Sequence, residues 1–545
     1  MASLHRLGLA LRTARHLRPQ QLAAQLAQRL RGPARTPART HVDRAIVDLA
    51  PCPEPWAPSC EGLPDAEGAV ALVGRPPHDP RRAGWEPGAN ALWSYTLHYH
   101  GWLGHPALPP AEAFATMCSW IDEHREGVGW EPYPTSMRVL HWLGVLHHHA
   151  GGLQAHARER ILGSLAAQLE HLAANVETHL DGNHVWTNLA ALVTAGVALR
   201  GPLPQRLLER FGPALVVTVG EQLLGDGVHG ERTPSYHCLL AEQLAVLLSY
   251  ARTQQPRLAD ALTPALGAMV GALPAFTHPD GDVALWGDSQ QGAPVTPAGL
   301  AARLGRPLPR SHADAPVSGL SRRRWGPLTL LWNRGDVGLP YQPGHIHGDA
   351  LSIELSLGAT RVLVDAGVGT YEVGPERAYA RSTAAHNTVT VGAADDDQHE
   401  LWASHRIGAR ARTETLACAE HRLVGRVRGH ASAALHRRTI EHLGGTIHIT
   451  DALEPPGGPG TVRYFVPATC SLVVHRDTAT IEAAGRRLVL RAVGMSWQHG
   501  PALGWVGMGR PAARVCLSLP VRAEGTRVEL CVAPEKARML DGEVW

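Results

Sequence analysis

A change in hydrophobic period divides the chain into two parts. Between about residues 111 and 310, apolar residues recur at helical spacing in Ala- and Leu-rich segments such as RERILGSLAAQLEHLAANVETHL and LLAEQLAVLLSYARTQQ. After about residue 320, alternating segments such as RRLVLRAV and RVELCVA dominate, and Gly-rich turns such as LGGT separate them. The pattern predicts a multidomain α+β protein that is helical first and β second, with the boundary near 311–320.

Each part indicates an architecture. Successive amphipathic helices with brief connections pack on one another, either as a bundle or as a closed ring of hairpins, and periodicity does not choose between these two. The alternating segments are typical of an antiparallel β-sandwich. Before both parts, residues 11–31 have the composition of a helix, and a Pro-rich connector follows through about Pro80. We therefore expect three regions, at 1–90, 91–315 and 316–545.

Composition limits the partners and the compartment. A formal net charge of +2 over 545 residues gives no strong overall field, and we expect no nucleic-acid partner. The eight cysteines contain no CxxC pair, which indicates free thiols in a reducing compartment. The N-terminus shows no secretory signal, and we expect no membrane span. These features favour a cytoplasmic location, with the periplasm or export left open.

Two clusters of polar residues lie just before predicted helices. The first, HLDGNHVWTNLAA, contains Asn183 and His184. Polar residues at such a position are most often helix caps. The second, GVHGERTPSYHCLLAEQ, contains Arg232 and Tyr236, and a tyrosine there is more often a packed aromatic residue than a catalytic one.

Two further clusters belong to the β part. In YQPGHIHGDALSIEL, an extended strand would place His345, His347 and Asp349 on one face. HxH is a plausible metal-ligand spacing, but 32 histidines in 545 residues produce about two such pairs by chance. The fourth cluster, YARSTAAHNTVTVG, contains Arg381 and His386 ahead of a strand, where polar residues commonly satisfy turns.

Taken together and in order, these clusters resemble the heparinase II/III family. The resemblance rests on NH, TPSYH, GHIHGDALSIEL, VDAG and RSTAAHNTV, and it runs from about residue 90 into the sandwich. It implies an N-terminal (α/α) toroid followed by a C-terminal antiparallel β-sandwich. It also implies cleavage of a uronate-containing acidic polysaccharide by β-elimination. The strings LWSYTLHYHGWL and GWEPYPTSMRVLHWL resemble members associated with bacterial surface polysaccharides.

The resemblance assigns roles to four residues. β-Elimination requires neutralisation of the sugar carboxylate, a base for the neighbouring proton and an acid for the departing oxygen. By resemblance, Asn183 and His184 face the carboxylate, with His184 as an alternative base for one epimer. Tyr236 transfers protons, and His345 completes the site from the β part, in a cleft between the domains.

The resemblance also implies a metal and substrate contacts. His347, Asp365 and His386 match the positions that bind zinc in the family, and we expect a structural Zn²⁺ that supports the segment presenting His345. A hydrogen-bonded cluster without metal is the alternative. Residues expected to contact the substrate are Arg232, Tyr379 and Arg381. The GWEPYP segment, with Trp130, Glu131 and Tyr133, is a weaker candidate for a sugar subsite.

Two other functions fit the same residues. A uronyl C5-epimerase would share proton abstraction and carboxylate neutralisation, and it would return the proton to the other face of the sugar. A non-catalytic polysaccharide-binding or assembly protein would keep the cleft alone. The sugar, the linkage and the oligomeric state are not encoded in recognisable motifs.

Overall fold

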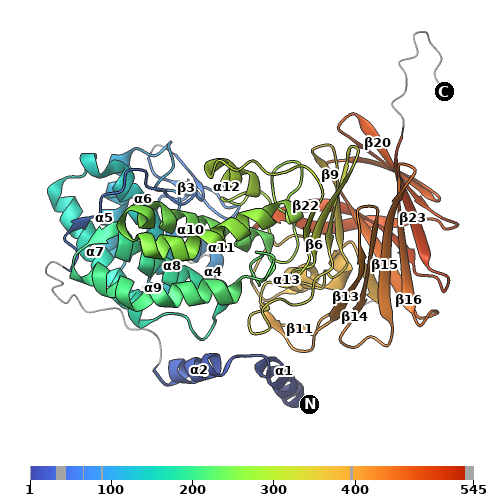
Figure 1. The fold of residues 1–545 in the computed structure, drawn as a ribbon, viewed down its shortest axis with the longest axis horizontal. Coiled ribbons are helices and arrows are strands. Elements are labelled where there is room, and N and C mark those ends of the chain that lie inside the picture. Colours follow the sequence, from blue (N-terminus) through green and yellow to red (C-terminus); the bar gives the residue numbers. More distant parts are fainter. Residues whose placement is uncertain (1, 32–44, 66, 87–89, 393–396, 534–545) are drawn as a thin grey trace, which may run out of the picture.

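The computed structural model describes residues 2–31, 45–65, 67–86, 90–392 and 397–533. Helices fill the first part of the chain and antiparallel strands fill the second, so the fold class predicted from the hydrophobic period is confirmed (Figure 1). The last of the toroid-side helices, α12 (Pro297–Arg303), ends ten residues before the first strand of the β part, β5 (Ala313–Ala315).

Helical hairpins form the toroid. The more buried member of each hairpin packs beside its counterpart in the next one, and the second members cover them. Ala- and Leu-rich sequence fits this arrangement, because small side chains let the inner helices approach closely while Leu fills the layer between them. The inner helices are α4 (Ala91–Tyr99), α6 (Pro132–His149), α8 (Gly182–Ala198) and α10 (Pro234–Gln254), and the outer ones are α5 (Pro110–Glu123), α7 (Ala155–Ala174), α9 (Pro202–Gln222) and α11 (Pro256–Ala272).

One expectation about the helices is wrong. By length and composition, the segment Pro256–Phe276 is apolar enough to cross a membrane, although the sequence was expected to contain no such stretch. Half of its apolar window is buried inside the toroid. Since the core helix of a globular domain passes the same test, this segment is explained by its packing.

The β part contains three principal antiparallel sheets. A five-stranded sheet contacts the toroid, and its Leu320 and Leu331 belong to the helical core. A four-stranded and an eight-stranded sheet complete the sandwich around a second core. The five-stranded sheet contains, in order, β5, β6 (Leu320–Trp325), β7 (Leu328–Asn333), β8 (Ile353–Leu357) and β9 (Thr360–Leu363). The four-stranded sheet contains β10 (Val389–Val391), β17 (Gly460–Pro467), β22 (Arg510–Pro520) and β21 (Gln498–Gly507). The eight-stranded sheet contains β13 (Arg412–Cys418), β14 (Arg422–Arg428), β15 (Leu435–Leu443), β16 (Thr446–Glu454), β23 (Thr526–Val532), β20 (Arg486–Ala492), β19 (Thr478–Ala483) and β18 (Ser471–His475).

Glycine allows one of the two-residue turns of the large sheet. β15 and β16 pair from Leu443 and Thr446 outward, so only Gly444 and Gly445 connect them. Both glycines have positive φ, 57° and 80°, which a two-residue hairpin of this twist requires and which L side chains rarely adopt. The LGGT turn predicted between two strands is confirmed.

Two helices lie outside both domains. The helix predicted over 11–31 is instead a pair, α1 (Ala2–Ala14) and α2 (Pro19–Arg31), with Pro19 beginning the second helix. Both lie beneath the body in Figure 1, α1 on the side of the sandwich and α2 on the side of the toroid. All eight cysteines lie in the described part of the chain and are unpaired there, in agreement with the expectation of free thiols.

Candidate functional site

The candidate catalytic residues meet where the toroid faces the sandwich. Tyr236 lies in the first turn of α10, and His345 lies in the loop between β7 and β8. Their rings stack with centroids 4.2 Å apart and an interplanar angle of 28°. Asn183, in the first turn of α8, brings its Nδ2 atom to 3.3 Å from His345 Nε2. Three residues predicted from separate clusters are therefore in direct contact.

The loop that carries His345 differs from its prediction. Residues 344–352 form turns and no strand, and β8 begins only at Ile353, so the expectation of a shared strand face for His345, His347 and Asp349 is wrong. The three side chains point to different neighbours. His345 contacts Tyr236, the His347 ring lies 5.5 Å from that of His386, and Asp349 accepts a hydrogen bond from the backbone N–H of Gly287.

A buried carboxylate that the sequence analysis missed organises this loop. Asp288 Oδ2 lies 2.7 Å from His345 Nδ1, and its Oδ1 lies 2.8 Å from His347 Nε2. The guanidinium of Arg377 in α13 (Pro375–Arg381) bonds to both oxygens. Burial alone would raise the pKa of Asp288, but Arg377 and the two imidazoles hold it well below its usual value. An ionised carboxylate only accepts hydrogen bonds, so both histidines donate to it.

This assignment fixes the chemistry of His345. Its Nδ1–H donates to Asp288, and in this tautomer Nε2 carries the lone pair. Asn183 Nδ2 lies near that nitrogen and also donates to Glu231 Oε2 at 2.8 Å. The buried carboxylate of Glu231 thus fixes the orientation of the Asn183 amide. The arrangement gives one ring nitrogen able to accept a proton and one amide able to donate a hydrogen bond.

Tyr236 is a protonated phenol with a phenolic neighbour. Its hydroxyl lies 3.0 Å from that of Tyr371, a residue that the sequence analysis did not select. Burial raises the pKa of Tyr236 well above its ordinary value, and the neighbouring Tyr371 adds to this. Burial and the charge on Asp288 also raise the pKa of Tyr371. Both groups therefore carry their protons at neutral pH, which suits a proton donor.

His184 lies beside this cluster with a different partner. Its Nδ1 is 3.1 Å from Glu177 Oε1, and its ring packs on Tyr133 at a centroid distance of 4.8 Å. Burial disfavours the charged ring, but the carboxylate of Glu177 outweighs it and the pKa of His184 is raised. His184 is consequently easier to protonate than a free histidine, as expected of a group that faces a sugar carboxylate.

A cavity of about 370 Å³ adjoins the cluster at Tyr236, whereas Asn183, His184 and His345 are not among its lining residues. The lining also includes Asp288, Tyr371 and Glu61 of the N-terminal connector. Burial raises the pKa of Glu61 to about 7, and no described residue bonds to its carboxyl group. The lining also contains Tyr99, Tyr133, Gln290 and Arg510 among mostly apolar residues and glycines, so its polar part combines phenols, carboxyl groups and a single arginine.

The three residues expected to contact the substrate lie away from this cavity. Arg232 is buried and donates to Ser318 O at 2.8 Å and to Asn333 Oδ1 at 2.5 Å. Arg381 is also buried and donates to Ser404 O at 3.0 Å. The Tyr379 ring packs 6.4 Å from that of Trp505. These placements argue against the predicted contacts and give the two arginines a bracing role between loops.

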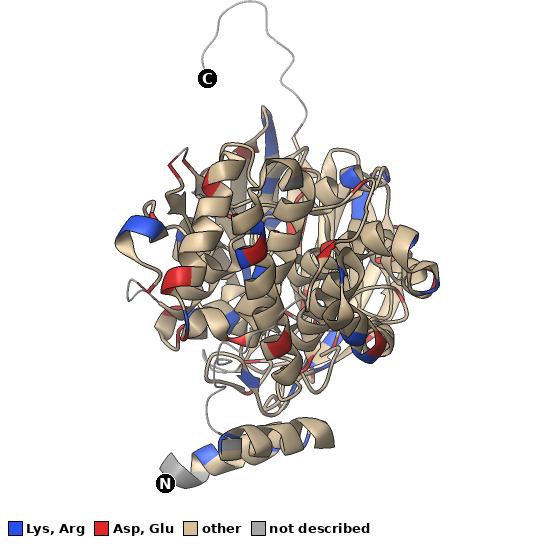
Figure 2. Ribbon diagram, turned by 90° about the vertical axis from the view of Figure 1, so that its left-hand side faces the viewer, with Lys and Arg blue, Asp and Glu red and all other residues tan. Residues whose placement is uncertain are grey.

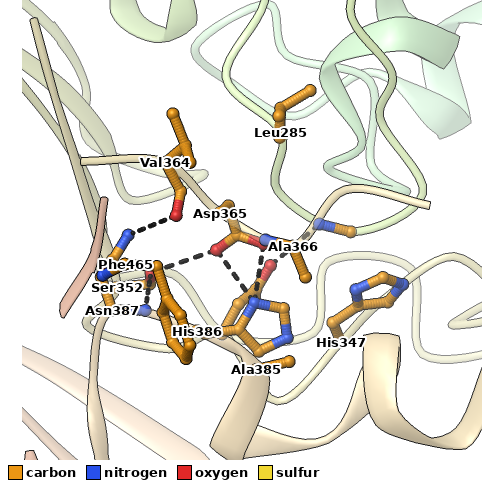
Figure 3. Close-up of polar contacts among 12 residues, drawn as sticks. Leu285, His347, Ser352, Val364, Asp365, Ala366, Ala385, His386, Asn387 and Phe465 are labelled. Atoms are coloured by element: carbon orange, nitrogen blue, oxygen red, sulfur yellow. Dashed lines mark hydrogen bonds and ion pairs between the residues drawn. The ribbon is translucent and has the colours of Figure 1, made fainter. Parts of the chain in front are cut away.

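The predicted zinc residues His347, Asp365 and His386 form a second cluster (Figure 3). Asp365 bonds to His386 Nδ1 at 2.7 and 2.9 Å, and His347 donates its Nε2–H to Asp288. Each ring thus has one nitrogen fixed by a carboxylate. The remaining nitrogens, His347 Nδ1 and His386 Nε2, are buried and have no hydrogen-bond partner among the described residues. A metal-binding histidine typically shows this pattern of one carboxylate-bound and one unbound nitrogen.

One detail of the zinc prediction differs from the structure. The Asp365 carboxylate orients His386, because its oxygens are taken by that ring, Ser352 Oγ and the backbone N–H of Ala366. A different set, Asp288, His345 and His405, places ligand atoms within 4.8 Å of one another. Since Asp288 already binds two imidazoles and Arg377, that second set leaves no oxygen lone pair directed at an ion.

Comparisons with known proteins agree with this architecture. The family model described as "Heparinase II/III-like, C-terminal" matches residues 307–517. A crystal structure titled heparinase III shares the fold with a TM-score of 0.66 at 15% identity, covering 84% of this chain and 81% of that one. A mutant of the heparan sulfate lyase HepC from Pedobacter heparinus has a TM-score of 0.58 at 16% identity, covering 85% and 81%. No curated protein sequence matches the chain.

The family match covers the C-terminal domain, and the structural likeness concerns the fold. The matched segment holds His345, His347, Asp365 and His386. The structural likeness extends over both domains and confirms the toroid followed by the sandwich. The chain therefore contains a heparinase II/III-like C-terminal domain at residues 307–517.

Proposed function

We propose that this chain is a polysaccharide lyase that cleaves a uronate-containing acidic polysaccharide by β-elimination. The observation that carries the proposal is the contact of Tyr236 and Asn183, from the toroid, with His345, from the β domain. Tyr236 also lines the adjoining cavity. An amide donor, an imidazole acceptor and a phenol donor are the three groups that this reaction requires. The solved structures of similar fold have titles that name them as heparinase III and heparan sulfate lyase.

In this proposal, Asn183 and His184 neutralise the carboxylate of the sugar. The Asn183 amide is held by Glu231, so its orientation is set before substrate binds. The raised pKa of His184 favours a positive ring when an anionic group arrives. A hydrogen bond and a positive charge on the sugar carboxylate make the adjacent C5 proton more acidic and stabilise the enolate.

In this proposal, His345 and Tyr236 carry out the two proton transfers. His345 Nε2 carries the lone pair, because Asp288 holds the proton on Nδ1, and it is suited to accept the C5 proton. The protonated Tyr236 phenol is suited to donate to the departing glycosidic oxygen, and Tyr371 at 3.0 Å supports it with a hydrogen bond. Water does not attack in this scheme, so no second catalytic carboxylate is needed.

The proposal also includes a substrate class and a cellular location. Elimination requires a carboxyl group on the carbon next to the one that loses its proton, which restricts the substrate to polymers containing uronic acid. The resemblance of the early aromatic segments to proteins of surface-polysaccharide production supports processing of an exopolysaccharide or capsule. We further propose a cytoplasmic location, which the free thiols of all eight cysteines support.

A structural zinc ion is part of the proposal. His347 and His386 would hold it through the two buried nitrogens that lack partners, and its role would be to fix the loop carrying His345. The ion supplies rigidity and positive charge behind the site. His345 itself keeps its contacts with Asp288 and Tyr236, so proton transfer depends on this chain's own side chains.

A substrate panel tests the function. Purified protein is incubated with non-sulfated and sulfated uronate polymers, and the ultraviolet absorbance of the conjugated product is followed. We expect absorbance to rise with at least one polymer and to be lost with Tyr236→Phe. Deuterium incorporation at C5 without absorbance would instead support an epimerase. Binding without either signal would support a non-catalytic protein and overturn the lyase proposal.

A further inference from the structure

Helices α1 and α2 form a strap beneath the two domains. In α1, Arg12 Nε donates to Glu400 Oε2 at 2.8 Å, and the Trp402 indole donates to Thr13 Oγ1 at 3.0 Å. At the start of α2, Arg18 pairs with Glu221 of α9 at 2.7 Å, and Gln21 donates to Leu180 O at 3.0 Å. One side of each helix is thus fixed to the body by polar contacts.

The other side of the strap is apolar and exposed. Leu7 and Leu11 of α1 are 56% and 63% exposed, one helical turn apart. Along α2, leucines repeat at the same spacing, with exposures of 43% at Leu22, 60% at Leu26 and 80% at Leu30. Residues four apart share a helix face, so the leucines form two stripes that face away from the protein. Contiguous apolar surface of this kind marks an interaction site.

The charge of the strap has a single sign. No Asp or Glu occurs before Asp43 in the sequence. Arg6 and Arg15 flank the leucine stripe of α1, and Arg29 lies beside that of α2; none of these three forms an ion pair with a residue that the structure describes. In Figure 2 the strap shows blue segments and no red ones, below a body that carries both colours.

We propose that the outward face of α1 and α2 binds the surface of an anionic lipid bilayer, which makes this chain a peripheral membrane protein. Helices with leucines on one face and arginines beside them lie in the plane of a membrane, with the leucines among the acyl chains and the guanidinium groups on lipid phosphates. Neither helix spans the bilayer, because 13 residues cover only about 20 Å of a core about 30 Å thick.

Charge favours lipid over the other possible occupants of this face. A symmetric contact with a second copy would place the unpaired arginines of one strap against those of the other, with no carboxylate in either strap to separate them. An acidic glycan would satisfy the arginines but would leave the five leucines in water. An anionic lipid surface with an apolar interior satisfies both kinds of residue.

Vesicle flotation with the full-length protein tests the proposal. Phosphatidylcholine vesicles are compared with vesicles that also contain phosphatidylglycerol, at low and high salt. We expect binding to the anionic vesicles only, weakened by salt. Replacing Leu7 and Leu11 with Gln should reduce the partition coefficient more than tenfold. Replacing Arg6, Arg15 and Arg29 with Gln should reduce it by about a hundredfold.

The matched control is Leu503→Gln, which removes an exposed leucine of β21 that is 39% exposed. This variant should bind like the unmodified protein, and circular dichroism should show all variants folded. Equal binding of the strap variants and the control would overturn the proposal. Failure of the unmodified protein to bind anionic vesicles would overturn it too, as would a dimer in light scattering that depends on Leu7 and Leu11. None of these readouts depends on lyase activity.

Discussion

The imidazole of His345 stacks on the phenol of Tyr236 at 4.2 Å, although one residue belongs to the β domain and the other to the toroid. Each ring has its own anchor within reach: Asp288 for the imidazole and Tyr371 for the phenol. Because the two rings come from different domains, His345 and Tyr236 can act together only while the β domain and the toroid are in contact.

Tyr236→Phe removes the proposed proton donor and keeps the ring stacking. We expect kcat to fall by a factor of about 10² to 10⁴, the usual contribution of a positioned acid or base, with KM nearly unchanged. The measurement is initial rate by product absorbance on whichever uronate polymer is cleaved. Tyr379→Phe is the control, because its ring packs near Trp505 outside the cavity. Comparable losses in both variants would contradict the assigned role.

Asp288→Asn leaves the buried guanidinium of Arg377 without a counter-charge. Breaking a buried ion pair from one side costs about 3–5 kcal/mol, so we expect a lower urea midpoint together with loss of activity. Combining Asp288→Asn with Arg377→Met removes both charges and should restore much of the stability without restoring activity. Recovery of activity in the double variant would show that Asp288 has only a structural role.

Glu61 predicts a pH dependence of substrate affinity. Its pKa of about 7 means that the carboxyl group is neutral below that pH and ionised above it. Because an ionised carboxylate in the cavity repels an anionic sugar, KM should rise as the pH is raised through 7. Glu61→Gln should flatten this rise, whereas Glu159→Gln on the exposed surface of α7 should leave it unchanged. An identical pH profile for all three proteins would exclude contact between Glu61 and substrate.

Buried histidines predict loss of stability in acid. Burial lowers the pKa of His141 and His237 to about 4 and that of His229 to about 3. In the unfolded chain these groups titrate near pH ~6.5, so between that pH and about 4 the unfolded state binds protons that the native state does not. Stability is therefore full above pH ~6.5 and falls as the pH is lowered, by up to about 3 kcal/mol per histidine.

Urea unfolding at a series of pH values measures this loss. The slope of the unfolding free energy between about pH 6 and 5 should correspond to more than one proton. His141→Gln should reduce the slope, since it deletes one of the titrating groups. A flat free energy across this range would mean that the histidines are accessible to protons in the native state.

Metal content separates the two candidate metal clusters. Protein purified without a metal-affinity tag should contain about one zinc ion per chain by elemental analysis, and a chelator should lower its Tm. His386→Ala should lose the ion, because it removes one of the two nitrogens without partners. His405→Ala, in the cluster around Asp288, should retain it. The reverse pattern would move the site to that cluster.

The change of hydrophobic period predicted much of the architecture. Helical spacing placed α7, α8 and α10, and alternation placed strands such as β16, β20 and β23, because burial of one face imposes these periods locally. The toroid was implied by the resemblance alone, since a bundle and a ring bury the same helix faces. The domain boundaries at 90/91 and 315/316 stay predictions.

The site was predicted in part, and the failures share a cause. Asn183, Tyr236 and His345 stood in recognisable motifs. Asp288 lies in WGDSQQG, where an aspartate between glycine and serine is indistinguishable from an ordinary turn residue. Its role arises from histidines and an arginine more than 50 residues away, and no local pattern encodes such contacts. Arg232 and Arg381 are buried and bond to backbone carbonyl groups, a placement that their motifs did not indicate, and their contact with substrate stays a prediction.

The location of Asp288 has a consequence for how a long polymer enters. Its own loop follows the toroid, and all three of its side-chain partners belong to the β domain. A hinge motion wide enough to admit a polysaccharide would separate His345 from Tyr236, and it would also break the hydrogen bond between His345 and Asp288. The polymer would then bind in an open state in which the catalytic residues are apart, and it would be cleaved in a closed state from which it cannot leave.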